Sequence, residues 1–141
     1  AKLAIEGMKL MYHNHAYEFE RLEETGKTIF EMLAENSDEN LFFELDLFWV
    51  QRGGANPIDM LRKMKGRMVT SHIKDMNGSA DNANVIAPIG KGNLNFGAII
   101  PACDECGVEY VFIEQDNAPE TDSMACVEYS LNTLKKMGGR F

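Results

Sequence analysis

The chain has 141 residues, of which 45% are hydrophobic and 26% charged, a composition typical of one globular domain spanning residues 1–141. A formal net charge of −8, without any segment in which Lys and Arg gather, argues against nucleic acid as a partner. The sequence has neither an apolar run approaching the ~20 residues that cross a bilayer nor a signal-peptide pattern, so we expect a cytoplasmic protein without a membrane partner.

The first half of the chain predicts two strand–helix pairs. A strand is predicted over 8–13 and a helix with an apolar stripe over 27–37. The next apolar run, 40–48, is continuous, as in strands that are buried on both faces. The helix predicted over 56–66 opens with Asn56 as its N-cap and a proline at its first position.

The second half repeats this pattern. A strand rich in β-branched residues is predicted over 67–73, followed by a helix over 95–107 that ends on a glycine. Pro101 lies inside that helix and is expected to kink or restart it. The last pair is a strand over 109–115 and a helix over 122–137.

Four strand–helix units in succession indicate a parallel α/β fold. Such units form either an open doubly wound sheet or part of a (β/α)₈ barrel. A complete barrel needs about 250 residues, so this chain could supply four units, or half of one. Hydrophobic periodicity does not distinguish the two architectures.

Residues that can bind metal or transfer protons lie at the C-terminal end of every predicted strand. In chain order they are His13, His15 and Glu18, then Glu44 and Asp46, then His72, Lys74 and Asp75, and finally Glu114 and Asp116. Any one of them alone is most simply a satisfied buried histidine or a surface carboxylate. Active sites of parallel α/β folds gather at this edge of the sheet, and the set together therefore predicts a metal site. Mixed imidazole and carboxylate ligands suit Mn²⁺, Co²⁺, Zn²⁺ or Fe²⁺ better than Ca²⁺.

Cys103 and Cys106 form a CxxC pair within the helix predicted over 95–107. Redox or zinc chemistry is one interpretation of this spacing. No second CxxC follows, and the position inside a helix favours ordinary reduced thiols, as in a cytosolic protein.

Several segments of the chain resemble the sugar phosphate isomerase/epimerase family of xylose isomerase-like TIM barrels, and their order and spacing match that family as well. They are YHNHAYEFE at 12–20, FELDLFWVQRGGANPIDMLRKMKGRMVTSHIKD at 43–75, and IGKGNLNFGAII with YVFIEQD between 89 and 116. The resemblance covers nearly the whole chain. It implies that the four predicted strands correspond to strands five to eight of the barrel.

In that family a divalent metal lies at the barrel mouth, held by residues of strands five to eight. The resemblance places Asp46, His72 and Glu114 at three of the four ligand positions. The strand-five position falls on His13, or on His15 if the register shifts by two. Family members usually have glutamate there, so the two-glutamate acid/base mechanism is not carried over directly.

The resemblance also suggests residues for substrate and proton transfer. Glu114 is the candidate base, and Glu18 is a possible replacement for the missing strand-five carboxylate. Trp49 and His15 are expected beside the substrate, although Trp49 could equally be a hydrophobic plug under the loop. Lys74 is expected to hold a substrate oxygen or phosphate and to offset developing negative charge.

The implied activity is interconversion of a ketose with an aldose or an epimer, by proton transfer through a metal-bound enediolate. A dehydratase or lyase on the same scaffold also begins by removing a proton beside a carbonyl. A half-barrel that only binds metal or self-assembles is the alternative outside catalysis. A half-barrel has two open sheet edges and an exposed apolar face, so we expect a homo-oligomer, for example a symmetric dimer.

Overall fold

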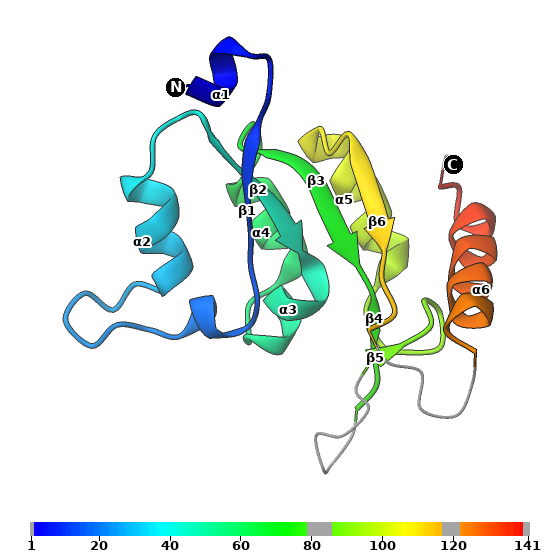
Figure 1. The fold of residues 1–141 in the computed structure, drawn as a ribbon. Helices are drawn as coiled ribbons and strands as arrows, with labels where there is room; N and C mark the ends of the chain where they lie inside the picture. The colour runs from blue at the N-terminus through cyan, green and yellow to red at the C-terminus, as the bar shows by residue number, and fades with distance from the viewer. Residues whose placement is uncertain (1, 79–85, 117–121, 140–141) are drawn as a thin grey trace.

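The computed structural model describes residues 2–78, 86–116 and 122–139. A four-stranded parallel sheet forms its centre, with the strands side by side in the order β1-β2-β3-β6 and pointing the same way (Figure 1). The strands are β1 (Leu10–His13), β2 (Leu41–Asp46), β3 (Met68–Ile73) and β6 (Tyr110–Ile113). All four predicted strands are therefore confirmed, and the parallel order matches four consecutive β/α units.

The helices follow the strands in the predicted alternation. They are α1 (Lys2–Ile5), the 3₁₀ turn η1 (Tyr17–Phe19), α2 (Ile29–Asn36), α3 (Leu47–Arg52), α4 (Pro57–Lys63), α5 (Phe96–Cys106) and α6 (Ser123–Lys136). The predicted helices correspond to α2, α4, α5 and α6. Within the described part of the chain, none of these helices has the length and apolar character needed to cross a membrane.

Helix boundaries are set by side-chain caps. Thr28 and Glu31 form a reciprocal capping box at the start of α2. Asn56 accepts hydrogen bonds from the backbone N–H groups of Ile58 and Asp59, as expected of the N-cap predicted for α4. Helix α5 ends at Gly107, whose φ of +78° suits glycine.

One detail of the prediction is wrong and another is narrowed. The strand predicted over 40–48 ends at Asp46, and α3 begins at the next residue. The apolar run continues into this short helix, so hydrophobicity alone does not mark the change. Helix α5 runs through Pro101 without restarting, and a kink at this position stays a prediction. The proline is tolerated there, although its missing N–H leaves one helical hydrogen bond unmade.

The two faces of the sheet differ. Phe43 and Leu45 alternate with the polar residues of β2 and are fully buried in the main core, with helix residues such as Leu61 and Ile99. Helices α4 and α5 lie behind the sheet on that side (Figure 1). The opposite face carries the histidines and carboxylates at its C-terminal edge. Further down, the same face leaves Tyr110 and Phe112 64% and 48% exposed.

Asp75 organises the loop between β3 and α5. It begins the short strand β4 (Asp75–Met76), which pairs antiparallel with β5 (Ile86–Ala87). Its buried carboxylate accepts hydrogen bonds from the N–H groups of Gly90, Gly92 and Leu94 at 2.9–3.0 Å. A Cβ on Gly92 would lie 2.6 Å from the Met76 carbonyl oxygen. Both glycines therefore shape this loop.

The CxxC cysteines are structural. Cys103 and Cys106 are buried free thiols on α5. Burial raises the pKa of Cys103 to about 12, so its reactive thiolate form is scarce near neutral pH. Buried, protonated thiols agree with the expectation of ordinary reduced cysteines, and their redox state stays a prediction.

Candidate metal centre

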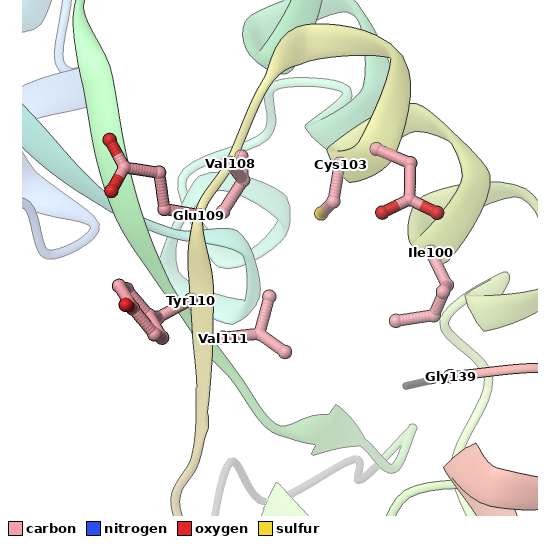
Figure 2. Close-up of a pocket in the computed structure, with 8 residues that line it drawn as sticks. Ile100, Cys103, Val108, Glu109, Tyr110, Val111 and Gly139 are labelled. Carbon is pink, nitrogen blue, oxygen red and sulfur yellow. The ribbon is translucent and has the colours of Figure 1, made fainter. Parts of the chain in front are cut away.

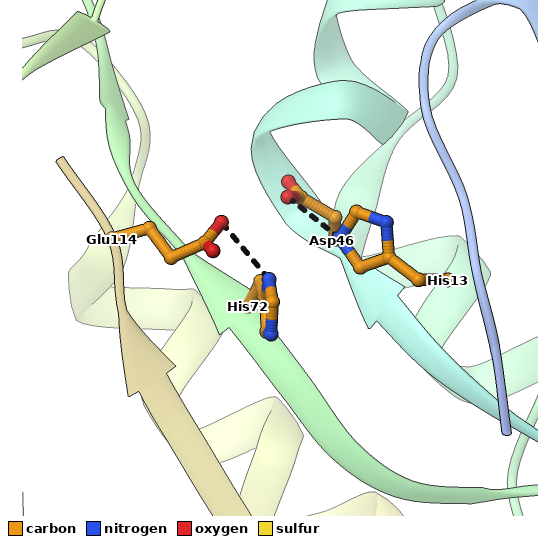
Figure 3. A group of neighbouring side chains, drawn as sticks. All are labelled: His13, Asp46, His72 and Glu114. Carbon is orange, nitrogen blue, oxygen red and sulfur yellow. Dashed lines mark ion pairs between the residues drawn. The ribbon is translucent and has the colours of Figure 1, made fainter. Parts of the chain in front are cut away.

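The strand register brings four of the predicted residues together. Asp46, the last residue of β2, lies opposite His72 on β3. His13 ends β1, and Glu114 directly follows β6. Parallel strands end at the same edge of a sheet, so the four side chains converge there (Figure 3).

These four side chains form a compact donor set. One ligand atom from each of His13, Asp46, His72 and Glu114 lies within 4.8 Å of all the others. His13 Nε2 is 3.3 Å from Asp46 Oδ2, and His72 Nδ1 is 2.9 Å from Glu114 Oε2. The sequence left open whether His13 or His15 is the metal ligand from the first strand. The donor set contains His13 and not His15, so the geometry favours His13 as this ligand.

The donor set fits a divalent transition metal. His13 Nε2, Asp46 Oδ2 and His72 Nδ1 are buried yet make no hydrogen bond of acceptable geometry. Buried polar atoms of this kind normally have partners, and a cation between them would satisfy all three. Ligands held at about 2.0–2.2 Å from an ion lie roughly 3–4 Å apart, so only a small inward adjustment is needed.

Lys74 provides positive charge beside this donor set. Its side chain is 2% exposed, and Nζ lies 3.0 Å from Asp46 Oδ2 and 3.1 Å from Asp116 Oδ2. It also donates a hydrogen bond to Glu114 Oε2. The lysine predicted to hold substrate therefore contacts two residues of the donor set directly.

The charges of the site are coupled. Burial alone would lower the pKa of Lys74, but the Glu114 and Asp46 carboxylates outweigh it and hold that pKa above its usual value. Burial would raise the pKa of Glu114, yet Lys74 and His72 bring it below its ordinary range. Lys74 is thus cationic and Glu114 anionic at neutral pH, the states required for charge compensation and for accepting a proton.

Asp46 is held by a residue whose role was not predicted. The buried Asn14 side chain accepts a hydrogen bond from the Asp46 N–H at 2.9 Å and donates one to its carbonyl at 3.2 Å. Asp46 Oδ1 caps α3 by accepting from Trp49 N–H at 3.0 Å, so Oδ2 is directed toward His13 and Lys74. The only signal for Asn14 in the sequence is its place between two histidines at a strand end.

His15 and Trp49, the predicted substrate contacts, lie beside the donor set rather than in it. The His15 ring centroid is 5.0 Å from that of His13 and 5.4 Å from that of Trp49. Lys74 Nζ lies 5.8 Å from the Trp49 ring centroid, a weak cation–π distance. His15 is exposed and Trp49 is half-buried. Their role in substrate binding stays a prediction.

Glu18 lies in a different environment. It is fully buried, and its two oxygens accept hydrogen bonds from Tyr12 Oη at 2.8 Å and from the His15 N–H at 2.9 Å. Burial and the Glu18 hydrogen bond raise the pKa of Tyr12, which keeps the phenol protonated as a donor. The geometry shows Glu18 fixing the turn after β1. A catalytic role for it stays a prediction.

A pocket of about 540 Å³ lies elsewhere, between β6 and α5 (Figure 2). It is lined by Ile100, Cys103, Asp104, Val108, Glu109, Tyr110, Val111 and Gly139. Three of these eight residues are aliphatic, and Glu109 is paired with Lys9 at 3.1 Å. It holds none of the four donor residues, so the chemistry of the chain centres on the strand ends instead.

Comparison with solved structures identifies the architecture. The crystal structure of a sugar phosphate isomerase/epimerase from Parabacteroides distasonis matches with a TM-score of 0.79 and 26% identity, over 95% of this chain and 48% of that one. A xylose isomerase domain protein from Planctomyces limnophilus matches with a TM-score of 0.69 and 18% identity, over 95% and 46%. The IolI protein, solved with a zinc atom, matches with a TM-score of 0.67 and 19% identity, over 96% and 50%. No family model and no curated protein matches the sequence.

The chain spans about half the length of the structures that it matches. Its four parallel β/α units have the fold of one half of a xylose isomerase-like TIM barrel. The choice between an open doubly wound sheet and a half-barrel is thereby decided in favour of the half-barrel.

Proposed function

We propose that this chain supplies the metal-binding half of a divalent-metal-dependent sugar or sugar phosphate isomerase/epimerase. The observation that carries the proposal is the donor set of His13, Asp46, His72 and Glu114 at the C-terminal edge of a parallel sheet. The likeness to a sugar phosphate isomerase/epimerase supports the substrate class, and the zinc in the IolI structure supports a metal of the Mn, Co, Zn or Fe group.

The residues of the site suit proton transfer next to a carbonyl group. A divalent cation bound by the four donors supplies Lewis acidity toward a sugar carbonyl. Glu114 is anionic, is 32% exposed, and lies at the open side of the site, where it can accept a proton from substrate. Lys74 is a fixed cation that would offset negative charge developing on a substrate oxygen.

Proton abstraction can be tested separately from complete turnover. We expect the purified chain with Mn²⁺ or Co²⁺ to exchange the proton beside the carbonyl of a ketose or ketose phosphate for deuterium, followed by NMR in ²H₂O. Glu114→Gln should lower the exchange rate by about 100-fold or more. The exposed Glu105→Gln, on α5, is the matched control. Metal binding without exchange would show that this chain is a binding half without catalytic activity of its own.

We also propose that two copies of the chain associate. Strands β1 and β6 each have one neighbour in the described sheet, so both edges present unpaired backbone groups. Leu10 on β1 is 52% exposed, and Tyr110 on β6 is 64% exposed. Size-exclusion chromatography with light scattering should show a dimer at micromolar concentration, weakened by Tyr110→Lys. A clean monomer would contradict this proposal.

A further inference from the structure

We propose that Glu44 is a positioning residue for His72, selecting the tautomer and ring orientation in which Nδ1 faces the metal site. This inference rests on the proposed function, because it concerns the same donor set. Glu44 was among the strand-end candidates in the sequence, but it is not one of the four clustered donors, and no specific role was predicted for it.

The two ring nitrogens of His72 face different carboxylates. Nδ1 is buried and lies 2.9 Å from Glu114 Oε2, within the donor set (Figure 3). Nε2 lies 3.3 Å from Glu44 Oε1. A metal-binding histidine normally donates its second ring N–H to a carboxylate or carbonyl, which fixes the ring and makes the ligating nitrogen more basic. Glu44 occupies that position relative to His72.

Glu44 is itself held in place. Thr70 lies opposite it in the strand register and donates a hydrogen bond from Oγ1 to Glu44 Oε1 at 2.7 Å. The side chains of Glu44 and His72 are only 19% and 18% exposed, so water competes weakly for their interaction. Thr70, Glu44 and His72 thus form a chain of contacts across β2 and β3 that leads to the donor set.

This arrangement has a defined chemical consequence. An Nε2–H that donates to Glu44 would keep the proton of neutral His72 on Nε2 and present the lone pair of Nδ1 to a cation. Without Glu44, the Nδ1–H form becomes accessible, with its proton directed at the Glu114 carboxylate. That form cannot bind a metal through Nδ1.

The test measures metal affinity and the tautomer, not turnover. We expect Glu44→Leu to weaken Co²⁺ binding, followed by visible absorption, by about 10- to 100-fold. ¹⁵N NMR of the metal-free protein should show that His72 is mainly Nε2–H in the wild type and shifts toward Nδ1–H in the variant. Glu44→Gln retains a hydrogen-bond acceptor, so its Co²⁺ affinity and its Nε2–H fraction of His72 should lie between those of Glu44→Leu and the wild type. Thr70→Val should cause a smaller loss of affinity.

Controls separate this inference from the proposed function. Glu105→Leu, at an exposed position on α5, should leave Co²⁺ affinity and the His72 tautomer unchanged. If Glu44→Leu does not fold, the His72 tautomer measured in Glu44→Gln and Thr70→Val tests the role of Glu44 instead. An unchanged tautomer together with affinity within about threefold of wild type would overturn the role of Glu44. Absence of Co²⁺ binding in the wild type would refute the metal site, while the tautomer would still test Glu44.

Discussion

Replacing Asp46 with asparagine is expected to lower the affinity for Mn²⁺ or Co²⁺ by about 100-fold or more, because changes outside the ligand sphere already cost 10- to 100-fold. Asp46 has two separable roles, since Oδ1 caps α3 and Oδ2 belongs to the donor set. Asparagine keeps a carbonyl oxygen for the cap and loses the anionic ligand. The fold should therefore survive the substitution while the site does not.

Metal content by mass spectrometry after incubation with each ion, together with a Co²⁺ titration, measures this loss. Asp116→Asn is a matched control, because Asp116 also contacts Lys74 but does not belong to the donor set. It should retain the metal. If Asp46→Asn binds Co²⁺ as tightly as the wild type, the donor set proposed here is wrong.

The sequence predicted which polar side chains lie at strand ends, and the resemblance selected four of them as metal ligands. His13, Asp46, His72 and Glu114 all terminate apolar segments, and parallel strands necessarily bring such termini to one edge of the sheet. Helix caps such as Asn56 were likewise predictable, because the cap interaction is local in sequence.

Roles that depend on register or on long-range contacts could not be predicted. Asn14 contacts Asp46 across 32 positions of sequence, and Glu44 faces His72 only because of the pairing between β2 and β3. The start of α3 was missed because Leu47 and Phe48 continue the apolar run of β2. Hydrophobic pattern reports burial there, and a strand and a short helix are equally compatible with it.

Lys74 is the other residue for which a large effect is expected. Its ammonium group is almost fully buried and lies among the carboxylates of Asp46, Glu114 and Asp116. Removing one partner of a buried ion pair costs about 3–5 kcal/mol, because the remaining charge is left uncompensated. Lys74→Met should therefore lower the free energy of unfolding of the metal-free protein by about that amount. Lys27→Met, which breaks an exposed pair with Glu35, should leave the free energy of unfolding nearly unchanged.

Bound metal should reverse the loss of stability in Lys74→Met, because a cation held by Asp46 and Glu114 replaces the positive charge that Lys74 provided. We therefore expect Lys74→Met to bind Mn²⁺ or Co²⁺ more tightly than the wild type, and saturating metal to restore most of its stability. Denaturant unfolding with and without metal measures both effects. Weaker metal binding in Lys74→Met would show that Lys74 orients the ligands instead of competing with the cation. In that event the lysine and the metal would act together, and the charge balance inferred for the metal-free site would be wrong.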